Sequence, residues 1–286
     1  MARSGKPVIE FTRFMEETLR DVSEVALEYH RSITSGDRSG PEIQIKDGDP
    51  NQVLTAADVA VGGEIQRRIL AQFPGHALLD EEQGYRGPAG GGEPEYTWVV
   101  DPIDGTSNFA AGTPLFGIMV GLLRGTTPVA GGVALPALDE IYLAERGAGA
   151  RCNGSSISVT DETDLLATLV AYGIDSHREA PDNTRDEMQL LGEIVLNVRN
   201  LRSANSAFDQ MMVARGAYGA CLNRSSRIWD NVAPAIIIQE AGGRYTDFFG
   251  QPMDFTISDD AINRTYTWCT ANPTLHDSIQ EIIHRR

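Results

Sequence analysis

The stretch of sequence that decides the fold is Trp98-Val-Val-Asp-Pro-Ile-Asp-Gly-Thr-Ser-Asn-Phe109. Its apolar, β-prone start predicts a buried strand that ends at Asp101, where Pro102 fixes the backbone. Asp104 follows three residues later, and Gly105-Thr106 is typical of a turn. Two carboxylates and a backbone carbonyl can therefore converge on one point, and Mg²⁺ prefers such oxygen ligands. The alternative is an Asp-rich turn whose side chains bond to their own backbone.

Three further segments place carboxylates at the ends of expected elements. Asp80-Glu81-Glu82 follows a short apolar strand, Asp230 stands at the expected N-cap of a helix, and Asp58 lies near another helix start. Adjacent carboxylates repel one another unless they are solvated or bound by cations. Each segment taken alone has a simpler interpretation, as a solvated charge run, a helix cap or a helix start.

The first half of the chain predicts two amphipathic helices followed by an antiparallel sheet. The helices are expected over 8–32 and 55–73, and the strands over 76–80, 96–100, 116–123, 128–135 and 140–145. Residues 35–51 and 84–94 are rich in turn formers and predict loops, the first with at most a hairpin around Ile43 and Ile45. Gly62-Gly63 predicts fraying or a kink in the second helix, because glycine disfavours helix interiors.

The second half alternates strands and helices, which predicts a three-layer α/β unit. Strands are expected over 166–172, 218–222 and 267–271, and helices over 184–198, 206–215, 230–241 and from about 274. We therefore expect an α+β chain with an N-terminal unit over 1–153 and a C-terminal unit over 154–286.

Acidic residues outnumber basic ones in this chain. Lys and Arg total 24, Asp and Glu total 40, and the formal net charge is −16. This balance argues against a nucleic-acid partner, which needs clustered Lys and Arg, and against an anionic membrane surface. No apolar run approaches the about 20 residues that span a bilayer, and the start has no secretory pattern, so a cytoplasmic location is expected. An anionic substrate would need something other than the overall field of the protein to neutralise it.

The four carboxylate segments together, in this order and spacing, resemble the inositol monophosphatase-like, metal-dependent phosphomonoesterases, which belong to a fructose-1,6-bisphosphatase-like superfamily. The similarity extends over residues 10–284, and the match over 101–109 is the most specific. The resemblance implies a sugar phosphatase fold with alternating α-β-α-β-α layers. It also implies a phosphatase that hydrolyses a small sugar or polyol monophosphate by direct attack of a metal-activated water, and a homodimer.

The resemblance implies a cluster of two or three Mg²⁺ ions, for which Mn²⁺ could substitute. Glu81, Asp101 and the Ile103 carbonyl would hold the first ion, Asp101, Asp104 and Asp230 the second, and Glu81 a weaker third. The phosphate would lie on these ions and on the backbone amides of Gly105 and Thr106. Thr106, hydrogen-bonded to Asp58, would orient the attacking water, with Glu82 in the surrounding water shell.

The leaving group would occupy a pocket between residues 173–177, 203–207, with Ser206 and Ala207, and 222–227. Here the chain departs from the family, because Asn223 stands where inositol-specific members carry a Glu that accepts hydrogen bonds from sugar hydroxyls. Arg224 and Arg227 add two guanidiniums that suit a second phosphate, unless both pair with surface acids. Fructose 1,6-bisphosphate, histidinol phosphate and 3′-phosphonucleotides remain alternative substrates, and a non-catalytic sugar-phosphate sensor is the more distant alternative.

Overall fold

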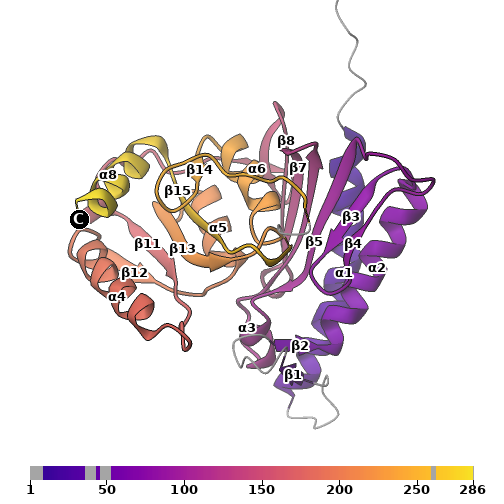
Figure 1. The fold of residues 1–286 in the computed structure, drawn as a ribbon, viewed down its shortest axis with the longest axis horizontal. Helices are drawn as coiled ribbons and strands as arrows, with labels where there is room; N and C mark the ends of the chain where they lie inside the picture. Colours follow the sequence, from indigo (N-terminus) through magenta and orange to yellow (C-terminus); the bar gives the residue numbers. More distant parts are fainter. Residues whose placement is uncertain (1–8, 36–42, 46–52, 259–261, 286) are drawn as a thin grey trace, which may run out of the picture.

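The computed structural model describes residues 9–35, 43–45, 53–258 and 262–285, in which two β-sheets alternate with layers of helices (Figure 1). Helices α1 (Ile9–Thr34) and α2 (Ala56–Gln72) cover the outer face of the larger sheet. Helices α5 (Ala207–Ala214) and α6 (Val232–Glu240) lie between the two sheets. Helices α4 (Pro181–Leu196) and α8 (Pro273–His284) cover the smaller sheet. This order confirms the expected α+β class with α-β-α-β-α layers.

The larger sheet has the strand order β10-β9-β8-β7-β6-β5-β3-β4. Its strands are β3 (Ala77–Asp80), β4 (Gly84–Arg86), β5 (Tyr96–Asp104), β6 (Gly117–Arg124), β7 (Thr127–Leu135), β8 (Glu140–Glu145), β9 (Gly149–Cys152) and β10 (Ser155–Ile157). All neighbours are antiparallel except β3 and β5, which run parallel. The predicted loop over 84–94 is wrong at its start, because β4 pairs with β3 through backbone hydrogen bonds that no side-chain pattern announces.

Both faces of the larger sheet are buried, which explains why its strands read as continuous apolar runs. Leu78, Trp98 and Val100 pack into the core beneath α1 and α2. Their neighbours Leu79 and Val99 point the other way, into the core shared with α5 and α6. The end of β5 is therefore held from two sides.

The smaller sheet has the order β12-β11-β13-β15-β14. Its strands are β11 (Leu169–Gly173), β12 (Asn200–Arg202), β13 (Ala220–Ser226), β14 (Arg244–Thr246) and β15 (Tyr266–Ala271). Strand β11 is parallel to β12 and β13, whereas β15 is antiparallel to β13 and β14. The three-residue strands β12 and β14 are too short to give a periodic signal in the sequence.

Short elements complete the described fold. Strands β1 (Ile43–Ile45) and β2 (Val53–Thr55) form the hairpin allowed for in the predicted 35–51 loop, most of which lies outside the described residues. Helix α3 (Thr106–Ala110) follows β5, and the 3₁₀ turns η2 (Pro136–Leu138) and η3 (Leu165–Ala167) connect strands. Among the helices that can be described, none is long and apolar enough to cross a membrane.

Gly62 corrects the expectation about the second helix. Helix α2 runs unbroken from Ala56 to Gln72, so the predicted fraying at Gly62-Gly63 is wrong. A Cβ on Gly62 would lie 2.9 Å from Pro102 Cγ and 3.3 Å from Asp80 Oδ2. The glycine therefore lets α2 pack directly against the ends of β3 and β5, where the carboxylates of interest lie.

Candidate active site

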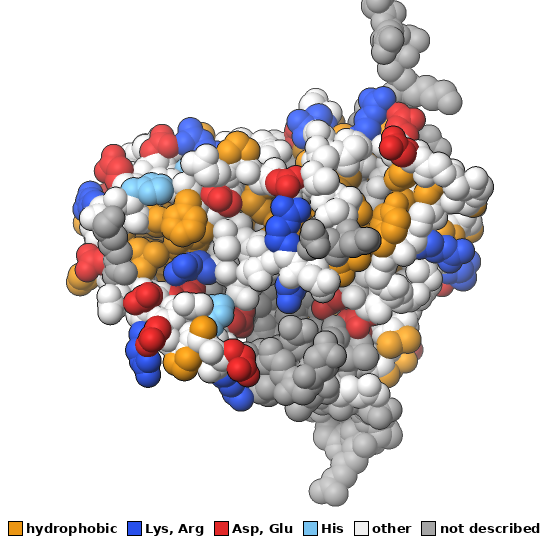
Figure 2. All heavy atoms as spheres, in the orientation of Figure 1, with side chains coloured by type: hydrophobic (Ala, Val, Ile, Leu, Met, Phe, Trp, Pro, Cys, Tyr) orange, Lys and Arg blue, Asp and Glu red, His pale blue; other side chains and the backbone are white. Residues whose placement is uncertain are grey.

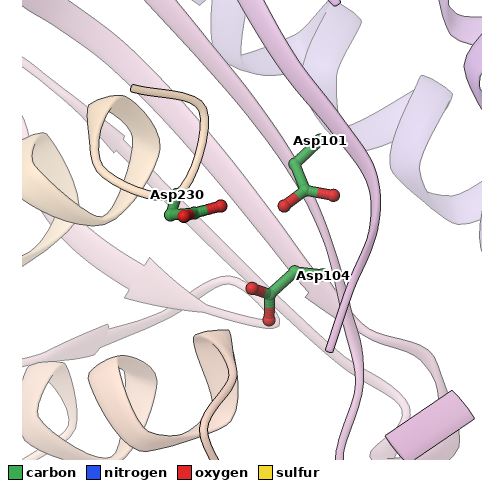
Figure 3. Close-up of side chains that lie close together, drawn as sticks. All are labelled: Asp101, Asp104 and Asp230. Carbon is green, nitrogen blue, oxygen red and sulfur yellow. The ribbon is translucent and has the colours of Figure 1, made fainter. Parts of the chain in front are cut away.

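Three aspartates from distant parts of the chain converge at the end of β5. Asp101 and Asp104 belong to β5, and Asp230 lies in the turn before α6. One carboxylate oxygen from each lies within 4.8 Å of the other two, and the side chains point toward one another (Figure 3). The convergence expected from the sequence is therefore present.

A bulge in β5 lets Asp101 and Asp104 share a side of the sheet. In a regular strand, residues three apart point to opposite faces. Asp101 pairs with Met119 and Asp104 with Gly117, so that β5 has one residue more than β6 in this interval. Such an extra residue re-aims the side chain that follows it. The proline within the motif lies in this bulge.

Asp230 is placed by a buried turn, and the expectation that it caps α6 is wrong. The N-cap is Asn231, a fully buried residue. Asn231 Nδ2 donates to Ser226 Oγ at 3.0 Å, and the Tyr245 hydroxyl donates to Asn231 Oδ1 at 2.9 Å. The Arg227 N–H donates to Asp230 Oδ2 at 2.6 Å. These contacts hold the carboxylate toward β5.

Burial and mutual repulsion make the bare aspartate cluster hold protons. Burial, followed by the charges of Glu81 and Asp104, raises the pKa of Asp101 well above its ordinary value. Burial and the Asp230 charge do the same to the pKa of Asp104, against an opposing hydrogen bond from the Ala207 N–H. Burial and Glu81 raise the pKa of Asp230 to about 7. A bound cation would reverse these shifts.

The donor set fits a hard divalent cation. Asp101 is 2% exposed, and its Oδ1 has no hydrogen-bond partner among the described residues. A buried carboxylate oxygen without a partner is costly unless a cation lies against it. Glu81 and the Ile103 backbone line the same cavity as the three aspartates. All these donor atoms are oxygens. Oxygen ligands suit Mg²⁺ and Mn²⁺ better than they suit Zn²⁺.

Gly105 and Thr106 form a tight turn beside the aspartates. Gly105 has φ +74°, and a Cβ there would lie 2.9 Å from Ser206 Cβ and 3.2 Å from the Leu115 carbonyl oxygen. Only glycine fits this conformation without strain. The Thr106 hydroxyl donates to the Ile103 carbonyl at 2.8 Å.

The expected hydrogen bond between Thr106 and Asp58 does not form between these two described residues. Asp58 Oδ2 instead accepts from the Thr55 N–H and the Thr55 hydroxyl, each at 2.7 Å, in a capping box at the start of α2. The neighbouring threonine satisfies this carboxylate oxygen locally. Burial raises the pKa of Asp58 to about 7.

The aspartates lie in the lining of a cavity of about 520 Å³. Of the predicted site residues, those lining it are Glu81, Asp101, Ile103, Asp104, Gly105, Thr106, Ser206, Asn223, Arg227 and Asp230. Asp58, Glu82 and Ala207 are not among its lining residues. The Ala207 N–H donates to Asp104, and the Glu82 charge contributes to raising the pKa of Asp58.

The two expected guanidiniums separate in the structure. Arg227 lines the cavity, and its Nη1 donates to the Asn263 carbonyl at 2.7 Å. Arg224 is not a lining residue, and its guanidinium lies 5.4 Å from the centre of the Phe248 ring, a cation–π contact. The expectation of a pair of pocket arginines is therefore wrong for Arg224.

The lining of the cavity also contains polar residues that the sequence motifs did not single out. Asp175, His177 and Asn205 line it, from segments that the resemblance placed near the leaving group. Asp175 follows Gly173 at the carboxyl end of a parallel strand, where ligands bind in α/β sheets. Its position just after a strand was the signal in the sequence that could have identified Asp175.

Surface charge is mixed rather than segregated. Lys and Arg side chains are scattered among Asp and Glu over the described residues of the face in Figure 2. This distribution agrees with the expectation that the protein does not attract anions through a broad basic surface.

Comparisons with known proteins agree with the geometry. The model of the inositol monophosphatase family matches residues 9–284. A fructose-1,6-bisphosphatase/inositol-1-monophosphatase from Aquifex aeolicus is 34% identical over 222 residues, which cover 77% of this chain and 78% of that protein.

Two solved structures share the fold. An inositol monophosphatase from Anabaena (Nostoc) sp. PCC 7120 has a TM-score of 0.79 and 27% identity, covering 97% of this chain and 96% of that one. An IMPase/NADP phosphatase solved with Mg²⁺ and phosphate has a TM-score of 0.79 and 20% identity, covering 98% of this chain and 97% of that one.

Proposed function

Because this chain belongs to the inositol monophosphatase family, we propose that it hydrolyses the monophosphate of a small sugar or polyol in the cavity that Asp101, Asp104 and Asp230 share. Members of this family are metal-dependent phosphomonoesterases. Hydrolysis of such esters is extremely slow without a catalyst, and the reaction needs mainly positioning and charge neutralisation. The single observation that carries the proposal is the convergence of three carboxylates, one of them buried and two partly buried, in the lining of a polar cavity.

Two or three Mg²⁺ ions are proposed at these carboxylates. Glu81, Asp101 and the Ile103 carbonyl would hold one ion, and Asp101, Asp104 and Asp230 another, with Glu81 serving a weaker third; Mn²⁺ could substitute. When bound, such a metal would neutralise the phosphate charge and would lower the pKa of a water molecule, which makes direct attack by water possible. A structural relative that holds Mg²⁺ and phosphate supports this assignment.

The residues of the chain bind and orient the reactants. Gly105, in its left-handed backbone conformation, and Thr106 line the cavity, and their backbone N–H groups are the proposed donors to a phosphate oxygen. The Thr106 hydroxyl group can rotate, so that it can donate to a water molecule in place of the Ile103 carbonyl. Asp58 and Glu82 do not line the cavity, and their proposed contribution is through their charges.

A substrate panel tests the proposal. Release of inorganic phosphate from sugar, polyol and nucleoside phosphates is measured with Mg²⁺ and then with excess EDTA. The proposal expects turnover of at least one sugar or polyol phosphate that stops on chelation and resumes when Mg²⁺ is restored. Turnover that resists the chelator contradicts the proposed metal dependence. A panel without any hydrolysis contradicts the proposed activity and favours a sensor.

A bisphosphate is the second candidate substrate. The name of the Aquifex aeolicus relative includes fructose-1,6-bisphosphatase, and Arg227 lines the cavity. If its guanidinium binds a second phosphate, Arg227→Ala weakens bisphosphate hydrolysis far more than monophosphate hydrolysis. Equal losses for both substrates reject this candidate.

The assembly, location and domain division of the protein are proposed as well. Family resemblance supports a homodimer and a cytoplasmic location, and the alternation of sheets supports units over 1–153 and 154–286. Sedimentation velocity tests the dimer, fractionation tests the location, and separate expression of the two halves tests the units.

A further inference from the structure

A directed chain of hydrogen bonds runs along the lining of the cavity. The Ser225 N–H donates to Asn223 Oδ1 at 2.6 Å, and Asn223 Nδ2 donates to Asn205 Oδ1 at 3.1 Å. Asn205 Nδ2 then donates to Asp175 Oδ1, also at 3.1 Å. All four residues line the cavity.

The direction of this chain is fixed by its first donor. A backbone N–H can only donate, so the Asn223 atom facing Ser225 must be the amide oxygen. Asn223 Nδ2 must then be the donor to Asn205, and Asn205 Nδ2 the donor to Asp175. The chain of hydrogen bonds ends on the Asp175 carboxylate, the one group in it that only accepts hydrogen bonds.

The backbone around this chain of hydrogen bonds holds it rigidly. The backbone N–H groups of Ala204 and Asn205 donate to Asp209 Oδ2 at 2.9 and 3.0 Å, which fixes Asn205 at φ +55°, a left-handed conformation that Asn tolerates. Gly173 pairs with Asn223 across the parallel strands β11 and β13. A Cβ on Gly173 would collide with both Asn223 Nδ2 and Asn205 Oδ1. The side-chain amides of Asn223 and Asn205 therefore occupy the space that a side chain on Gly173 would need.

We infer that Asp175 is the specificity-determining acceptor for hydroxyl groups of the leaving group, an inference that rests on the proposed phosphatase function. The Asn223 oxygen and one Asn223 N–H are occupied within the chain, so this amide is a weak acceptor for a polyol. Asp175, in the loop after β11, brings a carboxylate to the same cavity. A carboxylate accepts hydrogen bonds from several hydroxyls but repels a second phosphate. The substrate class is therefore the monophosphate of a polyhydroxylated leaving group without a further anionic group.

The test compares three substrates with wild-type protein and Asp175→Asn in Mg²⁺. Asn can still accept from Asn205, so the substitution removes the charge while sparing the network. Loss of a charged acceptor should raise KM for myo-inositol 1-phosphate about tenfold and change kcat less than about twofold. KM for p-nitrophenyl phosphate, whose leaving group in the pocket has no sugar hydroxyls, should stay within about twofold. KM for fructose 1,6-bisphosphate should fall, because one repulsive charge is gone.

The control is Asp182→Asn, an aspartate whose side chain is 89% exposed and pairs with Arg185. It should leave all three KM values unchanged. Equal loss of activity toward all substrates in Asp175→Asn indicates a structural role and overturns the inference, as do three unchanged KM values. If the wild-type protein hydrolyses none of the three, the proposed function itself fails and the inference with it.

Discussion

Asp101 bears the strongest electrostatic demands of any residue in the site. It is buried, it faces two other carboxylates, and its Oδ1 lacks a hydrogen-bond partner among the described residues. Such a group is expensive for a folded chain unless it is protonated or faces a cation. The residue therefore connects the stability of the metal-free protein with its proposed catalysis.

Asp101→Asn should abolish turnover while the protein remains folded. The substitution removes a ligand shared by two proposed ions, and we expect kcat to fall by at least about a thousandfold, the scale of losing a major electrostatic contribution. Thermal stability in EDTA should be equal or higher, since Asn replaces a buried carboxyl group that must either bind a proton or stay charged next to other carboxylates. Phosphate release and thermal denaturation measure the two effects. Asp254→Asn, an exposed partner of Arg264, is the control, and substantial residual turnover in Asp101→Asn rejects its bridging role.

At this scale the sequence predicted which residues converge better than it predicted their contacts. Asp101, Asp104 and Asp230 meet as the motifs indicated. The expected Thr106–Asp58 bond is not formed: Thr55, three residues before Asp58, donates twice to Asp58 Oδ2 in a capping box, the Thr106 hydroxyl donates to Ile103, and Asp58 Oδ1 has no hydrogen-bond partner among the described residues. Local competition between nearby donors depends on side-chain rotamers, and motif spacing does not contain that information.

The elements around the site matter through their close approach to one another. Helix α2 reaches the ends of β3 and β5 because Gly62 has no side chain, and the Ser226–Asn231 turn reaches β5 because buried polar groups hold it. Long periodic helices and apolar strands were predictable. The three-residue strands β4, β12 and β14 were not, because backbone pairing alone defines them.

Gly62→Ala and Gly63→Ala should change stability in opposite directions. An added methyl at Gly62 meets Pro102 at 2.9 Å, whereas at Gly63 it meets nothing within 4 Å. Overpacking should cost about 1–3 kcal/mol at Gly62, and Gly63→Ala should stabilise the helix by up to about 1 kcal/mol. Urea unfolding measures both values. Equal effects of the two variants would show that α2 does not pack closely at Gly62.

Tyr245→Phe should loosen the turn that carries Asp230. The Tyr245 hydroxyl contacts Gln210 Oε1 at 3.1 Å and Asn231 Oδ1 at 2.9 Å, and Gln210 Nε2 donates to the Asp230 carbonyl at 3.2 Å. Removal of the hydroxyl leaves buried acceptors unsatisfied, which should cost about 1–3 kcal/mol. The Mg²⁺ concentration for half-maximal activity should rise as well. An unchanged Mg²⁺ requirement together with lost stability would limit this network to folding.

For the whole molecule, a net charge of −16 is compatible with an anionic substrate only if neutralisation is local. The acidic cluster that contributes to this charge is also the proposed cation site. The overall composition argued against broad electrostatic capture of anions, and the face in Figure 2 has mixed charge, but composition could not reveal where cations would bind.

The stability of the metal-free protein should fall as pH rises from about 5 to 7.5. Burial raises the pKa of both Asp58 and Glu145 to about 7, so between their ordinary values and pH 7 the folded chain binds more protons than the unfolded chain. The free energy of unfolding therefore decreases with pH in that window. Urea unfolding in EDTA at both pH values measures it. Glu145→Gln should show a smaller decrease, and a rise of stability with pH would contradict the assignment.

The most direct test of the central claim is anomalous diffraction from a crystal soaked with Mn²⁺ and inorganic phosphate. The account predicts an anomalous peak among the carboxylate oxygens of Asp101, Asp104 and Asp230, with phosphate beside Gly105 and Thr106. An aspartate cluster that stays without a peak at saturating Mn²⁺ would contradict it.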